Sequence, residues 1–164
     1  MGLNGVSRRT VLGAAVVLGL TGCGRTEWYP SDVTPEEFTL RALIREKDRT
    51  VARYETALAE GAGPEDLLRP ILERHLAHRD SLVEALPEDS SPASAAPDEG
   101  GPEALPSEVL DLAELTALES AAAGARVDRA LAVADPGLAQ LISGIGACEA
   151  GHAYLLGRHG EDRG

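Results

Sequence analysis

The stretch that decides the fold is residues 138–156, which read LAQLISGIGACEAGHAYLL. At about 100° per residue, its large apolar side chains fall on one stripe, as in an amphipathic helix. Asp135 and Pro136 stand just before it, and an N-cap residue followed by proline is a signal that opens a helix. Glu149 and His152 lie inside the apolar stripe. This helix therefore carries an acid and an imidazole on the face that a core would cover.

Three further helices are expected upstream, each with its own start and stop signals. Thr34, Pro35 and Glu37 supply an N-cap, a first-turn proline and a third-position acid. The second helix contains Pro70, which either kinks the helix or marks its true start. The third is expected to open at Ser107. The four predicted helices span residues 34–60, 64–86, 107–134 and 136–157.

Residues 87–106 separate two predicted helical hairpins. They hold five of the ten prolines, five acids and no base, so they cannot bury enough apolar surface to order themselves. Neither hairpin alone has two faces with which to close a core. The sequence therefore predicts an all-α domain at residues 34–160, a four-helix bundle of two hairpins joined by a long proline-rich crossover.

Composition narrows the function classes. Only 3% of residues are aromatic, which disfavours a β-sandwich or barrel. The formal net charge is −12, from 15 basic and 27 acidic side chains, and this excess of acid argues against binding to nucleic acid. We recognise no activated nucleophile, phosphate-binding loop or matched acid–base pair, so we expect no catalytic activity.

The N-terminus reads as an export signal over residues 1–22. Residues 7–12, SRRTVL, resemble a twin-arginine motif, and the apolar run that follows is too short to span a bilayer. The run ends in Leu20-Thr21-Gly22-Cys23, which resembles a bacterial lipobox. This resemblance implies that Cys23 is lipidated and that residues 23–33 form a tether. We therefore expect the protein on the outer face of the cytoplasmic membrane, held by its lipid anchor.

Each predicted helix carries polar residues on or beside its buried stripe. Counted from the helix ends, these residues lie at similar heights, so antiparallel hairpins would bring them together in one layer at mid-bundle. Buried charge is costly unless it is paired or bound to a metal ion. The residues at matching heights are Glu46 and Lys47 on the first helix, His75 and His78 on the second, Glu119 on the third, and Glu149 and His152 on the fourth. Arg126 also lies within the buried stripe of the third helix.

Part of this layer resembles a known type of site. A glutamate on one helix (here Glu119) and Glu-x-x-His on its partner (here Glu149 and His152) are similar to half of a ferritin-like carboxylate site. Residues 138–156 and 73–82 also resemble the ferritin-like lipoproteins of actinobacteria, a family of unknown function. The resemblance covers about residues 36–157 and the export signal. It implies a ferritin-like bundle and no known reaction.

The other half departs from the di-iron pattern, which has a glutamate on the first helix and Glu-x-x-His on the second. Here the second helix offers His75 and His78, and Lys47 takes the centre of the first with Glu46 beside it. Two interpretations remain. In one, a divalent ion (Fe, Mn or Zn) is bound by His75, His78, Glu119, Glu149 and His152, with Glu46 as a further ligand. In the other, Lys47 and Arg126 neutralise Glu119 and Glu149, and the protein is a metal-free envelope scaffold whose protein partner and oligomeric state are unknown.

Overall fold

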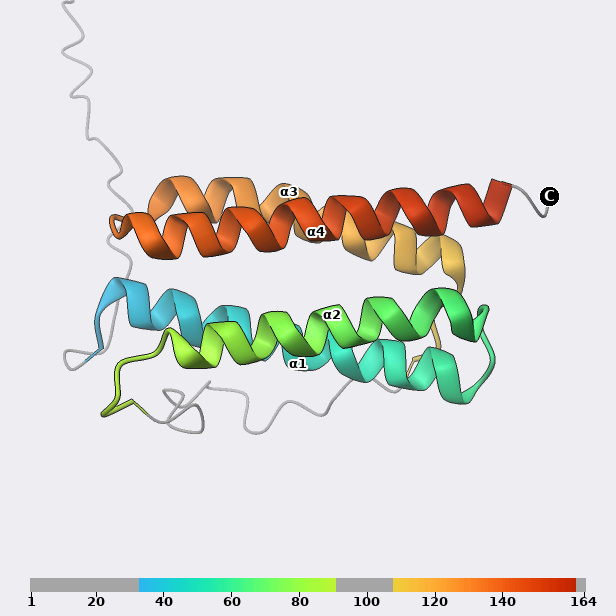
Figure 1. The fold of residues 1–164 in the computed structure, drawn as a ribbon, viewed down its shortest axis with the longest axis horizontal. Helices are drawn as coiled ribbons and strands as arrows, with labels where there is room; N and C mark the ends of the chain where they lie inside the picture. Colours follow the sequence, from blue (N-terminus) through green and yellow to red (C-terminus); the bar gives the residue numbers. More distant parts are fainter. Residues whose placement is uncertain (1–32, 91–107, 162–164) are drawn as a thin grey trace, which may run out of the picture.

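The computed structural model describes residues 33–90 and 108–161, which form four α-helices and, within those ranges, no strand (Figure 1). The all-α, four-helix prediction is confirmed. The helices are α1 (Pro35–Ala59), α2 (Glu65–Glu84), α3 (Leu112–Ala132) and α4 (Pro136–Glu161).

Local capping residues set where most of these helices begin. The Thr34 side chain accepts a hydrogen bond from the Glu37 backbone N–H at 3.1 Å, as expected for the start of α1. Asp135 accepts one from the Leu138 N–H at 2.6 Å and so caps α4. The α1–α2 turn passes through Gly61, whose φ of +66° suits a residue without a side chain.

The predicted start of α3 at Ser107 is wrong. The helix begins after Asp111, whose side chain accepts from the Glu114 N–H at 2.9 Å, while Glu114 accepts from the Asp111 N–H at 2.9 Å. Leu110 and Leu115 flank this capping box and both belong to the same apolar cluster, as in a hydrophobic staple. The reciprocal cap and the staple together fix the helix start.

Two other boundaries can be compared with the prediction. Helix α2 begins at Glu65 and continues through Pro70, so the alternative in which it begins at Pro70 is wrong. Pro70 has no backbone N–H, so α2 lacks one backbone hydrogen bond at this position. Burial of the apolar face of α2 offsets this loss. Helix α4 runs four residues past Gly157 to Glu161, and its last turn carries Arg158 and His159, cations that favour a helix C-terminus.

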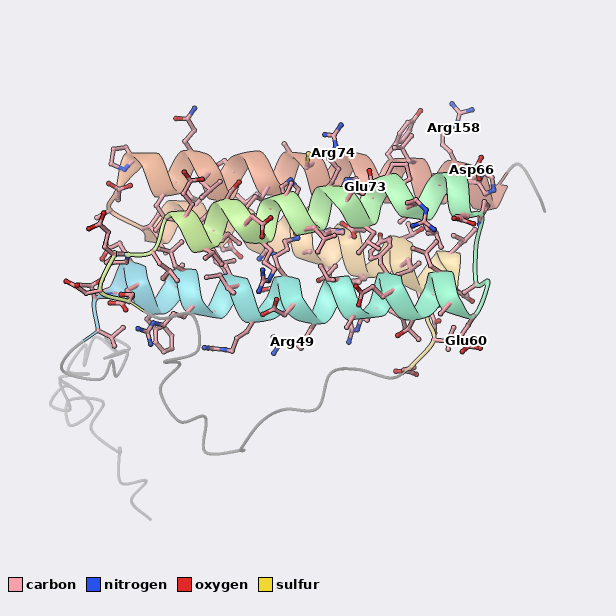
Figure 2. The ribbon with its side chains drawn as sticks, turned by 60° about the horizontal axis from the view of Figure 1, so that its bottom comes forward. Arg49, Glu60, Asp66, Glu73, Arg74 and Arg158 are labelled. Carbon is pink, nitrogen blue, oxygen red and sulfur yellow. The ribbon has the colours of Figure 1, made fainter. Side chains whose placement is uncertain are left out.

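The helices pack as two antiparallel hairpins, α1–α2 and α3–α4, laid side by side with their axes roughly aligned (Figure 1). Contacts within each hairpin are denser than those between α2 and α4. Many charged side chains, among them Glu60, Glu73 and Arg158, lie on the outside of the helices (Figure 2). The charges that matter for a site are therefore those that the hairpins enclose.

Two apolar clusters form the core, one toward each end of the bundle. Among the described residues, the side chains of both clusters come from residues 40–156, so the bundle carries its own core and is expected to fold without residues 1–23. The first cluster contains Leu40, Leu43, Ile44, Leu82, Leu86, Leu138, Ile142 and Ile145, and the second contains Tyr54, Ala57, Leu68, Ile71, Leu110, Leu115 and Leu156.

Several sequence predictions fall on residues outside the described ranges. These are the export signal, the lipidated Cys23, the tether except for Val33, and most of the linker at residues 87–106. None of the four helices combines the length and apolar character needed to cross a membrane.

Candidate metal centre

A layer of buried polar side chains separates the two apolar clusters. We call it the polar layer, and it draws on all four helices. Each member is at most 6% exposed. The positions of polar residues along the predicted helices indicated such a layer. Its members are Lys47, His75, Glu119, Arg126, Glu149 and His152.

Lys47 lies at the centre of this layer. Its Nζ donates a hydrogen bond to Glu149 Oε1 and lies 3.0 Å from His75 Nδ1. The two groups come from α4 and α2, so one ammonium group ties α1 to both. Lys47 and Glu149 are almost fully enclosed, which makes this a buried ion pair rather than a surface one.

Arg126 provides the second buried cation. Its Nη2 donates to Glu149 Oε1 at 3.0 Å and to Glu46 Oε1 at 2.7 Å. Burial alone would raise the pKa of Glu46, but the hydrogen bond and charge of Arg126 lower it below its usual range. Glu46, on the flank of the layer, also lies 3.0 Å from Arg129 Nη1. Glu46 and Glu149 are therefore both paired with arginine or lysine side chains.

Glu119 has a different set of partners. The Tyr54 hydroxyl donates to Glu119 Oε1 at 2.8 Å, and His75 Nε2 lies 2.7 Å from the same oxygen. His152 Nδ1 lies 3.4 Å from the other oxygen, Oε2. The prediction that a cation would neutralise Glu119 is therefore wrong. Two imidazoles and a phenol surround this carboxylate, while both buried cations contact Glu149.

The protonation states of these groups follow from burial and charge. Burial alone would raise the pKa of Glu119, but contacts with His152, His75 and Tyr54 hold it at about 2. Burial and the neighbouring Lys47 lower the pKa of His75, despite its hydrogen bond to Glu119. Burial and the charge of Glu119 raise the pKa of Tyr54. At neutral pH the group is a carboxylate, a neutral imidazole and a protonated phenol.

These states fix the tautomer of His75. An ammonium group can only donate, so His75 Nδ1 must accept the hydrogen bond from Lys47. The single ring proton then sits on Nε2 and is donated to Glu119. Lys47 therefore orients the imidazole and sets which nitrogen faces the carboxylate.

Three of the predicted ligands come together in one group with a geometry that a metal ion could occupy. His75, Glu119 and His152 are all buried and each offers one ligand atom within 4.8 Å of the others. Glu119 Oε2 and His152 Nδ1 are buried and have no hydrogen-bond partner among the described residues. This arrangement can hold a metal ion, because two imidazoles and a carboxylate are ligands that divalent ions take in proteins.

The remaining predicted ligands lie outside this group. Glu149 and Glu46 face Lys47 and Arg126, as described above. The ring of His78 lies on the flank, with its centroid 6.1 Å from that of His75 and 6.4 Å from that of His152. Burial, reinforced by Lys47, lowers the pKa of His78 to about 4.

Tyr54 also belongs to the site, although it is not among the predicted ligands. Its ring packs in the second apolar cluster, and its hydroxyl reaches Glu119. A buried tyrosine generally needs a partner for its hydroxyl, and that requirement is the signal that could have found it. In comparisons with known proteins, no family model, curated protein or solved structure matches this chain. Its function is therefore inferred from the geometry of the polar layer.

Proposed function

We propose that this chain is a membrane-anchored extracytoplasmic lipoprotein whose four-helix bundle binds one divalent metal ion through His75, Glu119 and His152. One observation carries the proposal of a metal site. Glu119 Oε2 and His152 Nδ1 are buried 3.4 Å apart, neither has a hydrogen-bond partner among the described residues, and His75 lies beside them. Unpaired buried polar atoms are costly, and a shared metal ion would satisfy both.

The size of the group supports this proposal. Two atoms bound to one ion at ~2.1 Å lie at most ~4.2 Å apart. The ligand atoms here lie within 4.8 Å of one another, so small side-chain rotations would close the group around an ion. Binding through His75 Nε2 would displace the proton that this nitrogen now donates to Glu119. If that proton moved to Nδ1, Nδ1 could no longer accept the hydrogen bond from Lys47, and the Lys47 side chain would have to shift.

The charge of the layer favours one ion over two. Glu149, the acid of the Glu-x-x-His pattern, is held by Lys47 and Arg126. A second ion would have to displace both cations and leave them buried without a partner, which is costly. Two imidazoles and one carboxylate suit Fe, Mn or Zn, and affinity is expected to rise in the order Mn, Fe, Zn.

The test is metal stoichiometry in the chain expressed from Gly24, which keeps all four helices and the linker and is called here the bundle chain. After loading with Zn, Fe or Mn and dialysis, we expect about one ion per chain by elemental analysis. Glu119→Gln and His152→Ala should abolish binding. His159→Ala, on the same helix but outside the polar layer, is the matched control and should retain it. Stoichiometry below about 0.1, or equal retention by all variants, would refute the metal site.

A metal-free scaffold is the second candidate, and a specific observation favours it. Lys47 and Arg126 equal Glu119 and Glu149 in number, so the charges of these four side chains cancel without an added ion. Such a network can specify helix register rather than bind a ligand. The two candidates separate in a thermal melt, since added Zn raises the melting temperature only if the folded state binds it.

The lipid anchor is a proposal with its own support and test. It rests on the twin-arginine-like residues 7–12 and on the lipobox-like residues 20–23. Cys23→Ser should abolish incorporation of labelled fatty acid and release the protein from the membrane fraction of the native host. Unchanged labelling and fractionation would exclude the anchor.

We also propose that the bundle is ferritin-like, with residues 87–106 crossing its full length. In Figure 1, α2 ends and α3 begins at opposite ends of the bundle, which supports a crossover. Twenty extended residues reach ~66 Å, while a helix the length of α3 spans ~32 Å, so the linker is long enough. A spin-label distance between positions 90 and 110 would test it: the two should be separated by most of the bundle length.

A further inference from the structure

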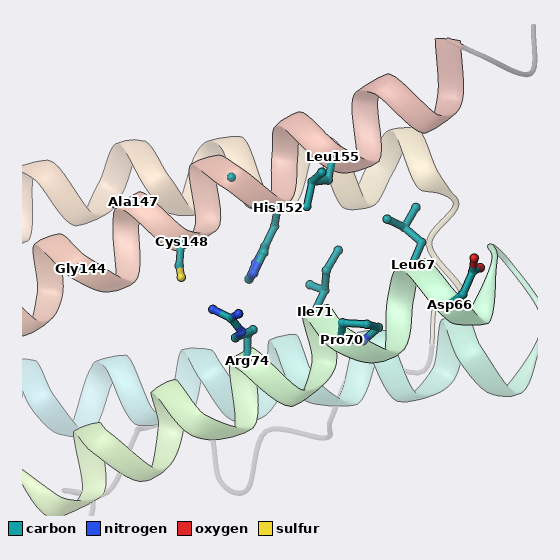
Figure 3. Close-up of a pocket in the computed structure, with 11 residues that line it drawn as sticks. Asp66, Leu67, Pro70, Ile71, Arg74, Gly144, Ala147, Cys148, His152 and Leu155 are labelled. Atoms are coloured by element: carbon teal, nitrogen blue, oxygen red, sulfur yellow. The ribbon is translucent and has the colours of Figure 1, made fainter.

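An apolar pocket of about 640 Å³ lies between α2 and α4, against one side of the polar layer (Figure 3). Its apolar wall is built mainly by Leu67, Ile71 and Leu155. On α4 the facing positions are small, with Gly144 and Gly151 at either end of the wall. This volume falls in the range of pockets that take small organic ligands.

Two polar side chains give the pocket a binding character. The His152 ring points from α4 toward α2 into the pocket, and this residue is only 6% exposed (Figure 3). Its Nδ1 lies 3.4 Å from Glu119 Oε2, so the ring separates the pocket from the polar layer. Arg74 extends from α2 toward His152 and Cys148 (Figure 3) and has no hydrogen-bond or ion-pair partner in residues 33–90 and 108–161.

A guanidinium that faces an apolar pocket in this way selects a ligand with an anionic head and an apolar tail. The guanidinium fork matches a carboxylate through two parallel hydrogen bonds. Asp66 lies at the other end of the pocket and would repel a second acidic group. The pattern favours a molecule with one carboxylate and an apolar tail.

We propose that this pocket binds a medium-chain fatty acid, with the carboxylate on Arg74 beside His152 and the acyl chain along Leu67, Ile71 and Leu155. Gly144 and Gly151 have no side chains, so α4 leaves room beside them for an acyl chain. The binding uses Arg74 and the pocket wall rather than His75 or Glu119, and it shares only His152 with the proposed metal group.

The test is calorimetric titration of the bundle chain with decanoate, decanol and decylamine, in EDTA and below their aggregation concentrations. These probes share a tail and differ in the charge of the head. We expect decanoate to bind at least about tenfold more tightly than decylamine, with decanol between them. Arg74→Gln should remove this preference for the anion while leaving the binding of decanol unchanged.

Blocking variants test the location. A Cβ added at Gly144 or Gly151 would have no atom of the described residues within 4 Å, so leucine there fits the helix and fills the pocket. Gly151→Leu and, as a second variant, Gly144→Leu should each abolish decanoate binding. Gly124→Leu is the matched control, because Gly124 lies on α3 away from the pocket with equally open space. All variants are checked for folding by circular dichroism.

Four results would overturn the proposal. Equal affinity for decanoate and decylamine would remove the role of Arg74, and equal loss in Gly124→Leu and Gly151→Leu would remove the pocket. No detectable binding of decanoate would exclude the ligand class. A dimer that Gly151→Leu dissociates would show that a second copy of the chain covers this face instead.

Discussion

Lys47 on the first helix and Glu149 on the last form an ion pair at the centre of the bundle, where their side chains are 1% and 0% exposed. The pair joins residues from the two different hairpins. Lys47 also hydrogen-bonds His75, and Glu149 also accepts from Arg126. The two hairpins are therefore connected by one continuous network of ion pairs and hydrogen bonds. The network reaches Glu119 through His75.

Lys47→Met is expected to lower the free energy of unfolding by about 3 kcal/mol, since it leaves a buried carboxylate short of one cation. The double variant Lys47→Met/Glu149→Gln should recover most of that loss, because the amide is uncharged and can still accept from Arg126. Urea denaturation of the three proteins measures both effects.

The control for this experiment is the exposed pair Arg69–Glu65 on α2, whose side chains are 55% and 70% exposed. Arg69→Met should change the free energy of unfolding by less than about 0.5 kcal/mol, because solvent screens the pair. A loss in Lys47→Met no larger than in Arg69→Met would show that the buried network contributes nothing specific.

Tyr54→Phe is expected to destabilise the bundle by about 1–2 kcal/mol. The ring would still fill the second apolar cluster, but Glu119 would lose one of its hydrogen-bond donors. If the metal site is present, the same variant should weaken Zn binding only modestly, since Tyr54 positions the carboxylate and is not needed as a ligand. Unchanged stability in urea would mean that the hydroxyl is equally satisfied by other groups.

Much of the layer could be predicted from the sequence because polar residues interrupt apolar stripes at matching heights. Which carboxylate meets which cation could not be predicted, since that depends on helix rotation and spacing. Lys47 and Arg126 both donate hydrogen bonds to Glu149, while Glu119 lies beside the imidazoles. The start of α3 could not be predicted for a related reason, because Ser107 and Asp111 are both acceptable N-cap residues. The packing of Leu110 in the second apolar cluster selects Asp111.

Acid is expected to destabilise the protein between pH 6.5 and 4 through the histidines on α2. The pKa of His78 is about 4 in the folded protein against an ordinary 6.5, so the unfolded chain takes up its proton first as pH falls. The stability that neutral His78 contributes is complete above pH 6.5 and is lost progressively toward pH 4. His75, whose pKa is also lowered, acts in the same direction.

Glu119 acts at lower pH, because a pKa near 2 keeps its contribution intact until the pH falls below about 4.5. His78→Gln should therefore flatten the pH dependence of the free energy of unfolding between pH 6.5 and 4. The change should be less than ~1.4 kcal/mol per pH unit, because the side chain is partly exposed. Urea titrations in EDTA at several pH values give the slopes, and identical slopes in the two proteins would contradict the assignment.

Gly146→Ala is expected to destabilise the bundle by about 1–3 kcal/mol, although alanine normally favours a helix. A Cβ at this position would lie 2.7 Å from Arg126 Cβ, close to the helix backbone rather than at a flexible tip. α3 and α4 would have to separate, which would pull Arg126 from Glu149 and Glu46. Gly124→Ala, where a Cβ meets no described atom within 4 Å, should instead stabilise by about 0.5–1 kcal/mol. Thermal melts of the two variants should therefore shift in opposite directions, and a shared upward shift would show that the close approach at Gly146 does not constrain Arg126.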